Sequence, residues 1–203
     1  MKPTQHILEQ EDIGRHGLEK KLLWPDALDI ECAMYAHFDV RKHIMVPNIT
    51  NAMALLAFET DLLVINKSGY ATGIEIKVSL SDLKADFKKR QYTEFDKVHP
   101  YTCKKGFERF YSKFKYFCYA VPCQLEKAAL QHVREEFGIY SYSLYEYPVL
   151  PDLRLVRKPQ KLSGYKWEGD QLFEVMRLGL MRLPALKFAV RASKYYTKTK
   201  KPA

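Results

Sequence analysis

The sequence predicts an α/β fold built on a mixed sheet, and three observations support this prediction. The runs 61–65 and 70–78 flank a polar turn that ends in Gly69, which indicates a β-hairpin. A continuous apolar run over 116–121 is typical of a buried central strand. Helix-like segments separate these runs, so we expect crossover connections beside the hairpin and both parallel and antiparallel strand pairs.

The first predicted element is a helix over 27–36. Pro25 precedes it and can open a helix, because the N–H that proline lacks has no partner in the first turn. Leu28, Cys32 and Tyr35 lie at helical spacing, so we expect these three residues to share one face.

Local turn and capping signals predict the remaining elements. A short strand over 43–46 is expected to end at Pro47, and Ser81 is expected to cap a helix after the hairpin. A helix over 125–137 and an alternating strand over 139–147 follow the central strand. The expected order is therefore α-β-β-β-α-β, followed by another helix, another strand and C-terminal helices.

Length and composition indicate one globular domain with extensions at both ends. We interpret residues 1–20 as an N-terminal arm, residues 21–160 as the domain, and residues 161–203 as a helical appendage with a basic tail. Hydrophobic residues make up 47% of the chain, which is enough to bury a core and argues against a disordered protein. The sequence has no run of 18 apolar residues and no apolar signal region, so we expect a cytoplasmic protein without a membrane partner.

The charge of the chain points to a polyanionic partner. The net charge is +9 and the isoelectric point is about 9.2, which favours nucleic acid, and we expect DNA. Lys84, Lys88, Lys89 and Arg90 are the candidate residues for contacts with phosphates, within a stretch rich in lysine and aromatic residues. The alternative is a helical segment with buried aromatic rings and solvated lysines.

Asp61, Glu75 and Lys77 are the candidate catalytic residues. Residues two apart in a strand point to the same face, so Glu75 and Lys77 project together, and hairpin pairing brings Asp61 toward them. Carboxylates are ligands for Mg²⁺ or Mn²⁺, and a nearby lysine can position or deprotonate water or stabilise a phosphorane. The structural alternatives are a solubilising Glu–Lys pair on an edge strand and an aspartate that caps a turn.

These residues resemble the PD-(D/E)XK superfamily of restriction-endonuclease-like nucleases, in which an acid precedes Glu-x-Lys across a hairpin. Here Asp61 is followed by thirteen residues and then by Glu75-Ile76-Lys77. The span 75–122 is more specifically similar to the MmcB-like group of DNA-repair and phage-associated nucleases. The matching residues are Ser79, Ser81, the run Asp82-Leu83-Lys84-Ala85-Asp86-Phe87, and Tyr116-Phe117 to Ala120-Val121-Pro122.

The resemblance implies a restriction-endonuclease-like core with a mixed central sheet flanked by helices, and a Mg²⁺- or Mn²⁺-dependent deoxyribonuclease of DNA repair, recombination or phage DNA metabolism. It also implies a further metal-binding glutamate on the first helix, for which Glu31 is the candidate and Glu59 a rival. The Gln-x-x-x-Tyr motif of the RecB-like branch is missing, because Gln91-Tyr92 has the wrong spacing. A catalytically inactive DNA-binding module and a basic α/β protein acting on RNA stay as alternatives, and a homodimer stays open.

Overall fold

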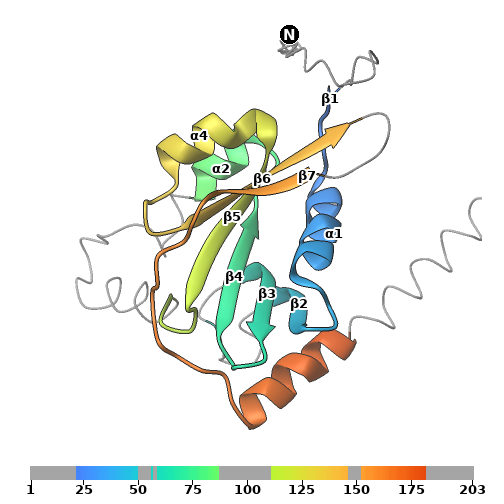
Figure 1. Ribbon diagram of the computed structural model, residues 1–203, viewed down its shortest axis with the longest axis vertical. Coiled ribbons are helices and arrows are strands. Elements are labelled where there is room, and N and C mark those ends of the chain that lie inside the picture. The colour runs from blue at the N-terminus through green and yellow to red at the C-terminus, as the bar shows by residue number, and fades with distance from the viewer. Residues whose placement is uncertain (1–21, 50–55, 57–58, 87–110, 146–151, 182–203) are drawn as a thin grey trace, which may run out of the picture.

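The computed structural model describes residues 22–49, 56, 59–86, 111–145 and 152–181 (Figure 1). The fold belongs to the α/β class and is built on one mixed sheet. Its strands are β1 (Leu22–Leu23), β2 (His43–Ile49), β3 (Thr60–Asn66), β4 (Ala71–Ile76), β5 (Tyr116–Pro122), β6 (Gly138–Tyr145) and β7 (Asp152–Arg157). Its helices are α1 (Ala27–Phe38), α2 (Leu80–Asp86), the 3₁₀ turn η2 (Cys123–Leu125) and α4 (Glu126–His132), with a further helix over 170–181.

The sheet confirms the mixed topology expected from the hairpin and the buried apolar run. Its strand order is β1-β6-β5-β4-β3-β2, and β7 pairs with the same β6. The pairs β2–β3 and β3–β4 are antiparallel, whereas β5 is parallel to both of its neighbours, β4 and β6. Strand β5 is central and buried. A sheet that contains parallel pairs usually has helices on both of its faces, and these helices shield the central strand from solvent.

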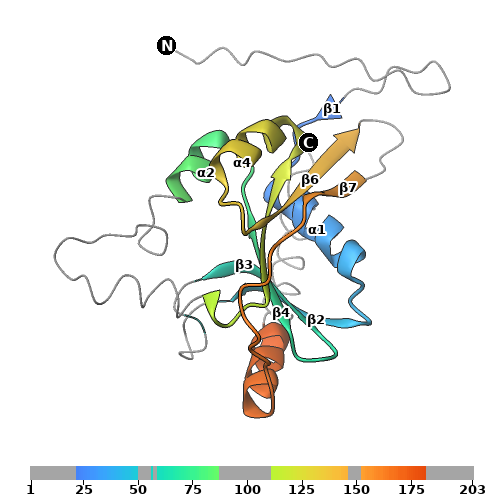
Figure 2. The ribbon, with the colours of Figure 1, turned by 60° about the vertical axis from the view of Figure 1, so that its left-hand side comes forward.

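Helices cover the two faces of the sheet separately (Figure 2). Helix α1 packs on one face, and α2 and α4 lie on the other. The α1 face buries a cluster that includes Ile30, Met34, Leu62 and Ile74. The opposite face, called here the α2/α4 face, buries a larger cluster that includes rings of β5 and of the residues just before it.

The face of the first helix that packs on the sheet is not the one that Leu28, Cys32 and Tyr35 were expected to share. Ile30, Ala33 and Met34 are its buried residues, whereas Leu28 is 63% exposed and Cys32 is also exposed. Both sets have helical spacing, so the sequence offered two stripes, and docking on the sheet selected the one that starts at Ile30. The helix begins after Asp26, whose side chain forms a reciprocal capping box with Asp29.

Strand β2 extends further than the sequence predicted. It runs to Ile49 and passes through Pro47, which pairs with Leu62 of β3. A proline has no N–H for the ladder and is tolerated in an edge strand, and β2 is the last strand of the sheet. The prediction that Pro47 ends the strand was wrong. The N–H that proline lacks would break the ladder in a central strand, but an edge strand tolerates its absence.

The helix after the hairpin begins earlier than predicted. The hydroxyl oxygen of Ser79 accepts a hydrogen bond from the backbone N–H of Asp82 at 3.1 Å, so Ser79 caps α2 and Ser81 lies inside its first turn. The next predicted helix is shorter than expected, because α4 ends at His132 and Val133 is already extended.

The segment after β7 returns along the sheet to the turn of the β3–β4 hairpin. Gly69 in this turn has a φ of 80°, and a Cβ there would lie 2.7 Å from the carbonyl oxygen of Trp167. The backbone N–H of Trp167 donates to the carbonyl of Gly69 at 2.8 Å. Trp167 and Val175, both within the predicted appendage, are buried in the core of the α2/α4 face. Among the described residues, no helix has the length and apolar character needed to cross a membrane.

Candidate catalytic cluster

The hairpin brings Asp61, Glu75 and Lys77 together at one end of the sheet. Strands β3 and β4 pair Leu62 with Ile74, so the next position along the ladder sets Asp61 opposite Glu75. Apolar neighbours at alternate positions pack under α1, so these three residues project toward the α2/α4 face. The hairpin and the shared face of Glu75 and Lys77 agree with the sequence prediction.

Hydrogen bonds to the main chain of neighbouring strands hold Asp61 and Lys77 in place at the cluster. The carboxylate oxygen Oδ2 of Asp61 accepts from the backbone N–H of Ile76 at 2.7 Å. The backbone N–H of Lys77 donates to the carbonyl of Ala120 at 3.0 Å, which extends the pairing with β5 beyond the end of β4. Both the acid of β3 and the lysine after β4 are therefore fixed by the main chain of the neighbouring strand.

Lys77 lies among three carboxylates. Its Nζ is 2.9 Å from Oε2 of Glu75, 3.4 Å from Oδ1 of Asp86 and 3.9 Å from Oδ2 of Asp61. The side chains of Glu75, Lys77 and Asp86 are 4%, 5% and 0% exposed, whereas that of Asp61 is 31% exposed. Solvent therefore reaches this otherwise buried cluster at the side chain of Asp61.

Asp86 is a member of this cluster that the sequence analysis did not assign. It lies in the last turn of α2, and its Oδ2 accepts a hydrogen bond from the hydroxyl of Tyr119 at 2.7 Å. Tyr119 stands beside Glu75 in the parallel pairing of β4 and β5. The available signal was the helical spacing of Asp86 and Leu83, three residues apart, because a charged side chain on the apolar face of a helix needs a partner.

Burial and charge shift the two central pKa values in the same direction. Burial, with the charge of Asp61 added, raises the pKa of Glu75 to about 8 despite the opposing effect of Lys77. Burial alone would lower the pKa of Lys77, but Glu75 and Asp86 outweigh this effect and hold it above its ordinary value. Without a bound cation, the cluster therefore favours an ammonium at Lys77 and a proton on Glu75 at neutral pH.

The structure does not bring the two other candidate acids to this cluster. Glu31 lies on α1, which packs against the opposite face of the sheet, and its Oε1 accepts a hydrogen bond from the hydroxyl of Tyr35 at 2.6 Å. Glu59 is exposed and lies just before the start of β3. Within the described ranges, no three His, Cys, Asp or Glu side chains are gathered closely enough to hold a metal ion.

One of the four candidate phosphate-binding residues can be placed. Lys84 is exposed on α2, the same helix that supplies Asp86 to the cluster. Lys88, Lys89 and Arg90 lie outside the described residues, as does most of the basic tail. Of these four candidates, the described residues therefore include only Lys84, on the α2/α4 face of the sheet that also carries the candidate catalytic residues.

Comparisons with known proteins give a similarity of fold only. No family model matches the chain, and no curated protein matches it. Among solved structures, the SPO1766 protein of unknown function from Silicibacter pomeroyi is similar, with a TM-score of 0.52 and 15% sequence identity. The similarity covers 84% of this chain and 94% of that one. At this identity the two proteins share an arrangement of helices and strands, and no activity follows from it.

Proposed function

We propose that the protein is a metal-dependent phosphodiesterase that cuts DNA, with Asp61 and Glu75 as ligands of Mg²⁺ or Mn²⁺ and Lys77 as the catalytic lysine. The observation that carries the proposal is the convergence of two carboxylates and one ammonium at the end of a hairpin, with Lys77 within 4 Å of both acids. The α-β-β-β-α-β order of α1 to β5 supports a restriction-endonuclease-like core.

The chemistry of the acids fits a divalent cation. Oδ1 of Asp61 and Oε1 of Glu75 accept no hydrogen bond from the described residues, so each carboxylate has an oxygen available as a hard ligand. The proximity of Asp61 raises the pKa of Glu75, and this repulsion is what a cation between the two would offset. Mg²⁺ keeps several water ligands and is held by one or two carboxylates, so two acids suffice.

The protein's own groups supply positioning and charge. A bound divalent cation would polarise the phosphoryl oxygen and lower the pKa of an attacking water. Lys77, held as an ammonium by the surrounding acids, would donate to a non-bridging phosphate oxygen and stabilise negative charge in the transition state. Asp86 would orient the Lys77 side chain, and the hydroxyl of Tyr119 holds Asp86 in place.

The choice of DNA rests on charge and on the resemblance to nucleases. The net charge of +9 favours a polyanion, and exposed Lys84 lies on the helix next to the cluster. Contacts from Lys88, Lys89 and Arg90, a role in repair or phage DNA metabolism, a homodimer and a cytoplasmic location stay predictions. A third metal ligand at Glu31 also stays a prediction, and it would require a site that reaches the α1 side of the sheet.

Cleavage by the purified protein tests the proposal. Duplex, single-stranded and branched DNA and RNA are incubated with Mg²⁺, Mn²⁺ or EDTA, and Mn²⁺ binding is measured by calorimetry. Asp61→Asn is the sharpest variant, because the amide oxygen can still accept from Ile76 while the charge is lost. Asp82→Asn, an exposed change on α2, is the matched control.

We expect metal-dependent cleavage of DNA that Asp61→Asn abolishes and Asp82→Asn leaves intact. Cleavage of RNA alone would favour a ribonuclease. A wild-type protein that binds DNA but neither binds Mn²⁺ nor cleaves would make the cluster a structural charge network in an inactive module, and the hydrolase proposal would be wrong.

A further inference from the structure

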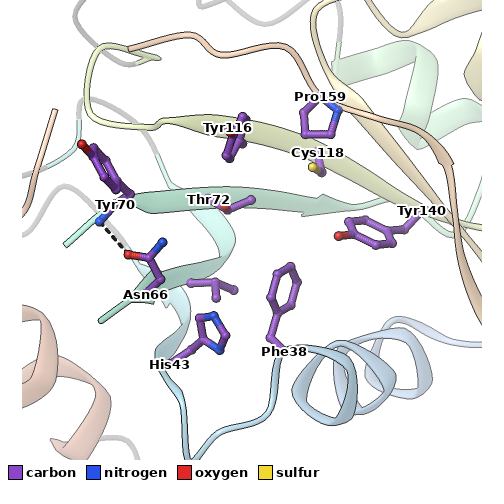
Figure 3. A pocket seen from close by; sticks show the side chains of 10 residues that line it. Phe38, His43, Asn66, Tyr70, Thr72, Tyr116, Cys118, Tyr140 and Pro159 are labelled. Atoms are coloured by element: carbon purple, nitrogen blue, oxygen red, sulfur yellow. Dashed lines mark hydrogen bonds between the residues drawn. The ribbon is translucent and has the colours of Figure 1, made fainter. Parts of the chain in front are cut away.

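A pocket of about 220 Å³ lies on the α1 face of the sheet (Figure 3). Half of the residues that line it are aromatic, and they come from separate parts of the chain. Those used in the argument below are Phe38, His43, Tyr70, Thr72, Tyr116 and Tyr140. The rings surround a common space in which the side chain of Thr72 is central (Figure 3).

The pocket is separate from the candidate catalytic cluster. Thr72 lies on the same strand as Glu75 but three positions before it, so the two side chains point to opposite faces of the sheet. Thr72 and Tyr116 also pair with each other near the starts of β4 and β5, whereas Lys77 follows the end of β4. A ligand in the pocket would not contact the acids of the cluster.

Two polar groups on the wall of the pocket have no hydrogen-bond partner among the described residues. Nδ1 of His43 is buried and makes no hydrogen bond. Tyr140 is 7% exposed, and among the described residues its hydroxyl has no hydrogen-bond partner. Burial raises the pKa of Tyr140, so this hydroxyl keeps its proton and can donate. Unsatisfied buried polar groups are destabilising, and a ligand with both donors and acceptors would satisfy them.

The size and walls of the pocket select a small, flat ligand. Pockets for drug-sized ligands hold roughly 300–1,000 Å³, so a volume of about 220 Å³ suits a single ring system rather than a larger molecule. Aromatic walls favour stacking, and the unpartnered polar atoms favour a ring that carries heteroatoms. A nucleobase has both properties.

The charge beside the pocket adds a preference for an anion. Nζ of Lys115 lies 4.0 Å from the ring centroid of Tyr70 and 5.5 Å from that of Tyr116. Nζ of Lys166 lies 5.4 Å from the same Tyr70 ring. None of the residues that line the pocket is acidic, and two ammonium groups lie against its rings, which favours a phosphate attached to the bound ring.

We propose that this pocket binds a nucleotide, with its base among the aromatic rings and its phosphate at Lys115 and Lys166. The proposal goes beyond hydrolysis at the catalytic cluster, because it concerns the other face of the sheet and requires no metal. The nucleotide could be free or an unpaired residue of a nucleic acid strand, since the recognised chemistry is the same.

Calorimetric titration of the full chain in EDTA tests the proposal. The probes are the nucleoside 5′-monophosphates, the matching nucleosides, a short single-stranded oligodeoxynucleotide, and the same oligonucleotide with abasic sites. Loss of base stacking in Tyr116→Ala should weaken binding about tenfold, while Tyr116→Phe retains the ring and the affinity. Lys115→Ala should also weaken binding about tenfold, while Lys127→Ala, exposed on α4, should not. Thermal melting confirms that each variant is folded.

The pattern of binding decides between the outcomes. Monophosphates that bind as tightly as the oligonucleotide assign the pocket to free nucleotides, and tighter binding of the oligonucleotide that abasic sites abolish assigns it to a strand. The proposal is overturned if neither the monophosphates nor the oligonucleotide binds. It is also overturned if nucleosides bind as well as monophosphates, or if a folded Tyr116→Ala variant retains full affinity. EDTA prevents metal-dependent cleavage, so a negative result here leaves the proposed hydrolase untouched, and the reverse also holds.

Discussion

The two faces of strand β4 carry opposite chemistry. Ile74 and Ile76 point toward α1 and pack among apolar side chains, whereas Glu75 points toward α2 and is buried beside Lys77 and two further acids. Burial of apolar area stabilises the fold, but burial of charge destabilises it unless partners compensate. One strand can therefore support the core with one set of residues and carry a buried charged cluster with the alternate set.

Removal of the ammonium should have the largest effect on the charged face. Lys77→Met keeps the length of the side chain but removes the charge that would stabilise the transition state, so we expect DNA cleavage to slow by about 10²- to 10³-fold. Cleavage rates and thermal melting are measured together, at a pH above 8 where Glu75 is ionised and can bind the cation. A folded variant that cleaves at the wild-type rate would remove Lys77 from the mechanism.

On the apolar face, helix α1 offers a matched pair of variants. Ile30→Ala removes a fully buried side chain and should lower the free energy of unfolding by about 3 kcal/mol. Leu28→Ala, on the exposed side of the same helix, should change it by less than about 0.5 kcal/mol. Urea unfolding measures both, and equal losses would contradict the orientation of α1.

The hydrogen bond between Tyr119 and Asp86 should contribute less than a core side chain. Tyr119→Phe removes the hydroxyl that donates to the buried carboxylate, so we expect a loss of about 1.5 kcal/mol. Tyr116→Phe on the same strand is the control, since no described residue hydrogen-bonds its hydroxyl. If both substitutions have the same effect on urea unfolding, the bond to Asp86 does not stabilise the fold.

The smallest expected effect is a change of stability with pH. The folded-state pKa of Glu75 is about 8 against an ordinary value of 4.5, so the folded protein holds a proton that the unfolded chain has lost between these values. The free energy of unfolding therefore falls as pH rises through this window. Glu75→Gln cannot titrate, and in EDTA its stability relative to wild type should rise by about 1 kcal/mol between pH 7 and 8.

Denaturant unfolding at the two pH values measures this difference, with the exposed Glu168→Gln variant as control. Parallel pH profiles for wild type and Glu75→Gln would show that the carboxyl is not neutral in the folded protein.

Period-two patterning explains why much of the cluster was predictable. Glu75 and Lys77 had to share a face once residues 71–76 formed a strand, and the polar turn after β3 set the hairpin that brings Asp61 to them. Asp86 was harder to assign, because its approach to Lys77 depends on how α2 docks on the sheet. Sequence spacing carries no information about that tertiary contact.

The same distinction explains the errors in the fold. Ser79 and Ser81 are both good capping residues, and their hydroxyls lie 3.0 Å apart, so local sequence could not choose between them. The extension of β2 through Pro47 depended on an edge position that only the completed sheet defines. The pocket was not predicted because its ring side chains are separated in sequence and meet only through the sheet and α1.

Trp167 lies after the last described strand but belongs to the same folding unit as the sheet. Its indole Nε1 donates to the carbonyl of Lys113 at 2.9 Å, its backbone N–H bonds the hairpin turn, and its ring is 1% exposed. A version of the protein shortened to residue 160 would keep every strand but would leave an indole-sized hole under the hairpin. Proteolytic trimming or recombinant shortening at that point should therefore yield a loosened, aggregation-prone product rather than a minimal domain.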